Sequence, residues 1–197
     1  MTQGSFTYPY PRPMVVVDAV VFTIREGRLD VLLIKRGHAP FEGMWALPGG
    51  FVDMDEELEV AAARELEEET GVRGVRLEQY HAFGGLGRDP RGRVITVAYL
   101  GVVASEAYRP CAGDDAADVA WMPVAGLPKL ASDHNLVVDT AIERLRLLAR
   151  ARKGDLGLLP PSVSKEYFLE ALNAVPSDLS DPSDPSDPSD PSGPKML

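Results

Sequence analysis

Three glutamates, Glu65, Glu68 and Glu69, stand at positions i, i+3 and i+4 of one stretch of the chain. On a helix these spacings place them on one face, where each like-charged pair costs an isolated helix ~0.2–0.5 kcal/mol. No lysine is interleaved between Glu56 and Val72 to offset the repulsion. One interpretation is an ordinary acidic, solvated helix surface. The other is a site for a divalent cation, with Mg²⁺ favoured because it uses few carboxylates and fills its other positions with water and phosphate oxygens.

The residues around the glutamates predict a helix over 56–70. Asp53 or Asp55 can cap its start, and Gly71 suits its end. An apolar stripe with helical spacing lies beside the acidic face, at Leu58, Ala62 and Leu66. The sequence WALPGG at 45–50 predicts a strand end entering a tight turn, in which the glycines let the backbone approach a ligand. Four residues of this region are expected in the core: Trp45, Leu47, Phe51 and Val52.

The whole run from residue 50 to residue 72, GFVDMDEELEVAAARELEEETGV, has the form Gly-x5-Glu-x7-Arg-Glu-Leu-x-Glu-Glu-x-Gly-Val. This form resembles the signature of the Nudix hydrolases, with every defined position filled: Gly50, Glu56, Arg64, Glu65, Leu66, Glu68, Glu69, Gly71 and Val72. The resemblance implies a Mg²⁺-dependent enzyme, with Mn²⁺ as the alternative ion. Its reaction would cleave the pyrophosphate of a nucleoside diphosphate linked to another group.

The resemblance also implies roles for individual residues. The catalytic centre would comprise Arg64, Glu65, Glu68 and Glu69. The three glutamates would bind the metal, and the backbone carbonyl of Gly49 would be a further ligand. Arg64 is expected to pair with Glu56 and to fix the loop against the helix. The general base would be a glutamate of the run or an acid outside it.

A second stretch, GGLGRDPRGR at 84–93, offers glycines followed by Arg88, Asp89, Arg91 and Arg93. Flexible backbone amides and guanidinium groups suit a phosphate or a ribose phosphate, so these four residues are predicted to bind substrate. The alternative is a polar hairpin loop whose arginines aid solubility. The stretch resembles the corresponding loop of bacterial Nudix proteins of the ADP-ribose and NAD-metabolism group, as does the AGDDA turn at 112–116. In that turn, Asp114 and Asp115 are turn residues or orient a water or an extra metal.

The amino-acid composition argues against several classes of protein. The 197 residues carry a net charge of −10, of which the Ser-Asp-Pro tail contributes −4 through five aspartates and one lysine. The remaining −6 argues against nucleic-acid binding, which needs a basic surface. No apolar run is long enough to span a membrane, and the start of the chain lacks a signal peptide's apolar segment. With the single cysteine Cys111, these features favour a cytoplasmic protein without disulfides.

The expected fold class is α/β, a Nudix-type α/β/α sandwich with a mixed sheet between helices. Strands are predicted at 15–24, 29–35, 75–83, 94–103 and 119–122, and a second helix at 135–152. The expected organisation is an N-terminal extension (1–13), a Nudix domain (14–153), a short C-terminal segment (154–176) and a disordered tail (177–197). The three histidines, His38, His81 and His134, are expected to pack or cap rather than to catalyse.

The preferred function is hydrolysis of ADP-ribose to AMP and ribose 5-phosphate, with a small nucleotide as the partner and a homodimer as the assembly. One alternative is an ADP-ribose-sensing transcriptional regulator that has lost or shortened its DNA-binding domain. The segment 154–175 is short for a winged helix, and no basic recognition helix precedes the acidic tail. Another alternative is a hydrolase that removes oxidised nucleotides.

Overall fold

A computed structural model describes residues 7–104, 116–151 and 157–176 of the chain. Within these ranges the elements are β1 (Met14–Arg25), β2 (Arg28–Arg36), β3 (Trp45–Ala46), β4 (Gly49–Phe51), α1 (Leu58–Thr70), β5 (Glu78–Phe83), β6 (Val94–Val102), β7 (Ala116–Pro123), α2 (His134–Ala151) and α3 (Lys165–Ala174). Residues 112–115 of the predicted turn at 112–116 and the predicted disordered tail lie outside the described residues. No helix in the described ranges is long and apolar enough to cross a bilayer.

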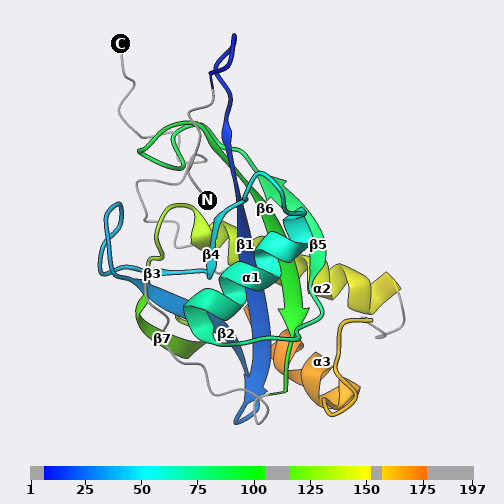
Figure 1. The fold of residues 1–197 in the computed structure, drawn as a ribbon. Helices are drawn as coiled ribbons and strands as arrows, with labels where there is room; N and C mark the ends of the chain where they lie inside the picture. The colour runs from blue at the N-terminus through cyan, green and yellow to red at the C-terminus, as the bar shows by residue number, and fades with distance from the viewer. Residues whose placement is uncertain (1–6, 105–115, 152–156, 177–197) are drawn as a thin grey trace, which may run out of the picture.

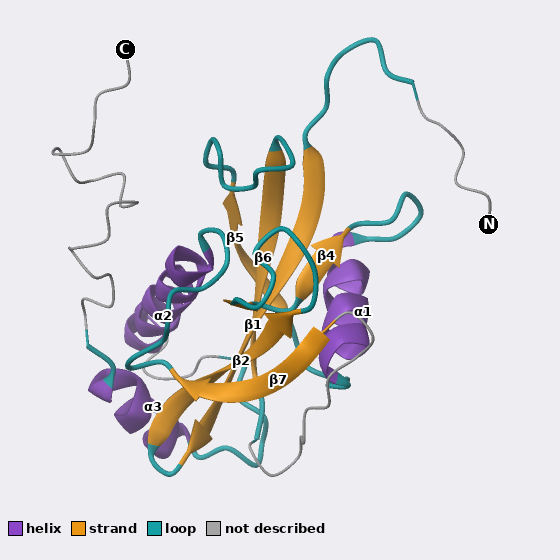
Figure 2. Ribbon diagram, turned by 90° about the vertical axis from the view of Figure 1, so that its left-hand side faces the viewer, coloured by secondary structure: helices purple, strands orange, loops and turns teal. Residues whose placement is uncertain are grey.

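The described strands form one mixed sheet that is organised around β1. β1 pairs with β6 in parallel and with β2 in antiparallel fashion, and β4 pairs with the first half of β1. α1 covers one face of the sheet, while α2 and α3 cover the other (Figures 1 and 2). The predicted α/β/α sandwich with a mixed sheet is therefore confirmed.

The side chains of β1 explain why both faces need a helix. Its burial is almost continuous, as expected for a strand covered on both sides. Because side chains alternate along a strand, one set packs with α1: Val17, Ala19 and Val21. The other set packs with α2 and α3: Val20, Phe22 and Ile24. The acid Asp18 interrupts this second, otherwise apolar set and is also buried.

The acidic helix α1 ends where the sequence predicts but begins differently. Gly71 adopts a left-handed conformation with φ of 70°, and its N–H donates to the Glu67 carbonyl. The predicted capping by Asp53 or Asp55 is wrong: Glu57 occupies the capping position, and no side chain bonds there. Glu56 instead accepts a hydrogen bond from the Asp53 N–H at 2.8 Å. The Glu56 side chain therefore bonds both to the loop backbone at Asp53 and to Arg64 of α1.

Strand β5 differs most from its prediction, since it begins at Glu78 and carries a bulge. Gln79 pairs with Tyr99 but His81 pairs with Ala98, which leaves Tyr80 as the extra residue. Gln79 and His81, on either side of the bulge, are both exposed. The Tyr80 hydroxyl donates to the Val137 carbonyl of α2 at 2.7 Å and so fastens β5 to that helix.

Helix α3 was not predicted from the sequence. Ser164 caps it by accepting the Tyr167 N–H. Phe168, Ala171 and Leu172 are buried in the hydrophobic cluster that also contains the inward side chains of β1 and α2. α3 therefore belongs to the same core as the sheet, and the predicted boundaries between domain and C-terminal segment stay a prediction.

Candidate active site

Two glycines bring strand β4 into close contact with β1 and α1. β4 pairs with residues 16–18 of β1, so Gly49 lies opposite Asp18. A Cβ atom on Gly49 would lie 2.1 Å from the Val17 carbonyl oxygen, and one on Gly50 would lie 2.5 Å from a Glu65 carboxylate oxygen. A side chain at Gly49 would push β4 away from the β1 backbone, and one at Gly50 would displace the Glu65 carboxylate. The glycines therefore let β4 approach β1 and α1, and the predicted approach of this backbone to a ligand stays a prediction.

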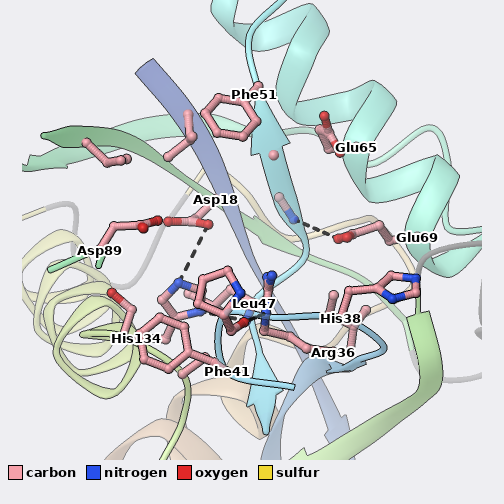
Figure 3. Close-up of a pocket in the computed structure, with 18 of the residues that line it drawn as sticks. Asp18, Arg36, His38, Phe41, Leu47, Phe51, Glu65, Glu69, Asp89 and His134 are labelled. Carbon is pink, nitrogen blue, oxygen red and sulfur yellow. Dashed lines mark hydrogen bonds and ion pairs between the residues drawn. The ribbon is translucent and has the colours of Figure 1, made fainter. Parts of the chain in front are cut away.

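A pocket of about 400 Å³ opens beside this turn (Figure 3). It receives Glu65 and Glu69 from α1 and Gly49 and Gly50 from β4. The loop between β5 and β6 contributes Arg88, Asp89 and Arg91, and further lining residues include Asp18, Arg36, His38, Phe41, Leu47, Phe51, Asp53, Arg64, Ser132 and His134. The size suits a small molecule. The two stretches singled out in the sequence thus face one cavity.

Arg64 connects the loop after β4 to helix α1 through several hydrogen bonds. Its guanidinium donates to both oxygens of Glu56, at 3.0 and 2.5 Å, and to the Phe51 carbonyl at 3.1 Å. The hydrogen bonds from Arg64 lower the pKa of Glu56 to about 2. The expected pair of Arg64 with Glu56 is present. The same guanidinium also donates to Glu65 at 2.8 Å and to Glu68 at 3.0 Å.

The two pocket-facing glutamates of α1 are poorly hydrated. Burial raises the pKa of Glu69 to about 8, and the nearby Glu65 charge adds to the rise. The Gly49 N–H opposes it by donating to Glu69 at 2.9 Å. Burial also raises the pKa of Glu65, although its hydrogen bond from Arg64 acts in the other direction. Positive charge added beside these carboxylates would favour their ionised forms.

The donor set agrees in kind with Mg²⁺ or Mn²⁺, because carboxylate and carbonyl oxygens are the ligands that these ions prefer. In the described ranges, however, no three His, Cys, Asp or Glu side chains already converge on one point. Glu68 is at the exposed side of α1, with 59% of its side chain accessible, and shares the Arg64 Nη1 group with Glu65. Metal binding by Gly49, Glu65, Glu68 and Glu69 therefore stays a prediction.

The predicted substrate-binding arginines have different environments. Arg88 is buried, with 5% of its side chain exposed, and donates to both carboxylate oxygens of Asp133, at 2.9 and 2.7 Å. Arg93 donates to the carbonyls of Gly84 and Gly85 and does not line the pocket. Substrate binding by these residues stays a prediction. The guanidinium of Arg88 is already engaged by protein carboxylates.

Arg91 and Asp89 form a pair at the mouth of the pocket. Arg91 donates to both Asp89 oxygens, the shortest contact being 2.7 Å, and its guanidinium lies 5.2 Å from the centre of the Phe51 ring. The prediction that Phe51 belongs to the core is wrong, since 42% of it is exposed. On the short strand β4 the preceding Gly50 faces α1, which turns Phe51 outwards to the pocket.

Sequence reasoning missed the place of two polar residues in the pocket, the buried Asp18 and the largely buried His134. The signal for Asp18 was available, since it is the one acid in the apolar run VVVDAVVF. His134 does satisfy a backbone group, as expected of a capping residue, but that group is the Leu47 N–H at 2.9 Å. Its partner lies 87 residues away in the sequence, so no local pattern reveals the contact.

Comparisons with known proteins agree with this geometry. The family model described as NUDIX domain matches residues 13–141. The ADP-ribose pyrophosphatase of Methanocaldococcus jannaschii is 40% identical over 130 residues, covering 66% of this chain and 73% of that protein. The ADPR responsive transcriptional repressor NtrR of Acinetobacter baylyi is 36% identical over 156 residues, covering 77% of this chain. That alignment spans 62% of the repressor, less than two thirds of its length.

Among solved structures, the Nudix domain of Shewanella oneidensis NrtR in complex with ADP ribose superposes with a TM-score of 0.64. It is 38% identical, and the superposition covers 71% of this chain and 94% of that one. The match of the family model over most of the chain, with the glutamate helix and glycine turn assembled around one pocket, leads to one conclusion. This chain belongs to the Nudix family.

Proposed function

We propose that this protein hydrolyses ADP-ribose to AMP and ribose 5-phosphate with the help of Mg²⁺. One observation carries the proposal: the α1 glutamates Glu65 and Glu69 and the loop residues Arg88, Asp89 and Arg91 line the same pocket. A diphosphate near α1 would leave room for groups on both sides. The names of the archaeal pyrophosphatase and of the NrtR domain complexed with ADP ribose support this substrate.

The metal, when bound, would neutralise the diphosphate oxygens and lower the pKa of a water for in-line attack on phosphorus. Glu65, Glu68, Glu69 and the Gly49 carbonyl would hold it. The protein's own contribution is positioning. Arg64 bridges Glu56, the Phe51 carbonyl and two of these glutamates, so it sets the distance between strand β4 and α1.

The direct test is to incubate the purified protein with Mg²⁺ and a panel of nucleoside diphosphate derivatives and to identify the products. ADP-ribose should give equimolar AMP and ribose 5-phosphate, and EDTA should abolish the reaction. Oxidised dGTP belongs in the panel, because a kcat/KM for it well above that for ADP-ribose would favour the nucleotide-sanitising alternative. The homodimer, the cytoplasmic location and the lack of nucleic-acid binding predicted from the sequence belong to the same proposal.

A second candidate is an ADP-ribose-responsive regulator. One observation favours it: the alignment with the Acinetobacter repressor spans 156 residues, longer than the 13–141 stretch that matches the family model. Tight ADP-ribose binding without turnover in Mg²⁺, together with binding to a specific DNA site, would establish this function. Turnover of ADP-ribose without DNA binding would exclude it.

A further inference from the structure

The pocket contains a buried carboxylate that lacks a hydrogen bond. Asp18 is 5% exposed and lines the cavity from β1, and its Oδ2 atom has no hydrogen-bond partner among the described residues. Its nearest cationic neighbour, the Arg88 Nη2 atom, lies 3.8 Å from Oδ2. That distance is too long for a hydrogen bond. A buried acceptor without a partner is costly, so this atom needs a donor from outside the protein.

The neighbouring His134 supplies a matching donor. Its Nδ1 atom accepts the Leu47 N–H, so the proton of the neutral ring is on Nε2. Burial lowers the pKa of His134, which favours this neutral form. The Nε2 atom lies 3.9 Å from Asp18 Oδ1 (Figure 3), again too far for a direct hydrogen bond. The unpartnered Asp18 Oδ2 therefore lies in the same part of the cavity as Asp18 Oδ1 and His134 Nε2, which do not bond to each other.

The charge of the residues beside Asp18 favours a neutral partner over a phosphate. Arg88 is paired with both oxygens of Asp133, and Asp18 adds a second carboxylate beside it. With His134 neutral, the group of Asp18, Arg88, Asp133 and His134 carries a net charge of −1. A phosphate would be repelled. A hydroxyl group fits, because it donates to a carboxylate and accepts from an imidazole N–H at the same time.

We propose that Asp18 and His134 form a subsite for the vicinal hydroxyl groups of a ribose. One hydroxyl donates to Asp18 Oδ1 and accepts from His134 Nε2, and its neighbour donates to Asp18 Oδ2. Arg88 is then a positioning residue, because it holds the loop after β5 against Asp133 beside the diol. This subsite rests on the proposed function in so far as the ribose belongs to an ADP-ribose bound in the pocket.

The experiment compares ADP-ribose with one ligand that lacks a hydroxyl of the adenosine ribose and one that lacks the second ribose altogether. Dissociation constants would be measured by isothermal titration calorimetry in EDTA, where no turnover occurs. The ligands are ADP-ribose, its 2′-deoxyadenosine analogue and the β-methyl ester of ADP, which lacks the second sugar. One analogue should bind to the wild-type protein at least about tenfold more weakly than ADP-ribose, a difference of 1.4 kcal/mol. Weaker binding of the 2′-deoxyadenosine analogue would place the adenosine ribose in the subsite, and weaker binding of the methyl ester would place the second ribose there.

The variant Asp18→Asn tests the residue. It keeps the size of the side chain, and it should reduce the tenfold discrimination to within about twofold. His134→Asn is the second variant, because the Asn oxygen can still accept the Leu47 N–H while the Nε2 donor is lost. It should also weaken the discrimination, which keeps the test valid if Asp18→Asn fails to fold. Asp53→Asn is the matched control, since it removes an exposed carboxylate from the same pocket.

Two results would overturn the subsite. One is wild-type protein that does not distinguish either analogue. The other is Asp18→Asn that retains the full discrimination, including the case in which it weakens all three ligands equally. Turnover of ADP-ribose with unchanged discrimination in Asp18→Asn rejects the subsite and keeps the hydrolase. Lost discrimination in a protein that shows no Mg²⁺-dependent turnover rejects the hydrolase and keeps the subsite.

Discussion

Replacing Glu69 with glutamine should stabilise the metal-free protein while removing its catalysis. The substitution keeps the shape of the side chain and leaves an oxygen for the Gly49 N–H. It removes a carboxyl whose pKa burial raises to about 8 from an ordinary value of 4.5. Between these two pH values the unfolded chain has released the proton and the folded protein retains it. The stability of the wild-type protein therefore falls as pH rises through this window.

The size of the effect follows from the same two values. At pH 7 the unfolded chain is 2.5 pH units above its pKa of 4.5, which corresponds to at most about 3 kcal/mol at 1.36 kcal/mol per unit. For a protein of this size, each kcal/mol shifts the melting temperature by about 2–4 °C. Glu69→Gln should thus melt like the wild type near pH 4.5 and several degrees higher at pH 7–8.

The assay is thermal unfolding in EDTA across pH 4.5–8.5, with Glu67→Gln as the control. Glu67 is on the same helix, but its side chain is about half exposed and lies near Arg73, so its removal should leave the pH dependence unchanged. With Mg²⁺ present, the wild type should gain stability and Glu69→Gln should lose at least about tenfold in kcat, which is 1.36 kcal/mol of barrier. Parallel melting curves for wild type and Glu69→Gln at every pH would refute the reasoning.

Three further perturbations can be tested. Arg88→Ala should lower the free energy of unfolding by about 1–3 kcal/mol in chemical denaturation, because the partly exposed Asp133 loses its bidentate partner and the buried Asp18 loses its cationic neighbour, whereas Arg91→Ala at a more exposed position should change it by under about 1 kcal/mol. Phe168→Ala should cost about 3–5 kcal/mol by the same measurement if α3 is part of the core, and a loss below about 1 kcal/mol would show that α3 undocks. Truncation after Pro176 should leave the melting temperature and the turnover unchanged, and a tenfold loss of rate would mean that the tail binds the domain.

The fold could be predicted where local patterns determine structure. The run around Arg64 and Gly71 identified α1, and the long apolar runs identified β1 and β6. The caps and strand limits could not be predicted as well, because tertiary contacts decide them. Glu57 occupies the start of α1 without a capping side chain, Arg64 binds Glu56 across the loop, and the Tyr80 hydroxyl at the bulge bonds to α2.

In the candidate site, too, local spacing predicts some features and tertiary contacts determine the others. The spacing of Glu65 and Glu69 predicts that they share a face, and both line the pocket. No spacing reveals that Asp133 binds Arg88, 45 residues earlier in the chain, or that His134 bonds to Leu47. A buried polar group takes whichever partner the packed fold brings to it, so these contacts depend on the tertiary structure alone.

The parallel pairing of β1 with β6 has a consequence for how the chain folds. Every pair in that ladder joins residues 80 positions apart, as in Met14 with Val94. Such long-range contacts close large loops and slow folding, whereas the β1–β2 hairpin needs only the turn at Glu26 and Gly27. During synthesis at about 5–20 residues per second, β1 waits several seconds for its partner to be made. Through that interval its apolar side chains and one unpaired edge are open to other nascent chains and to chaperones.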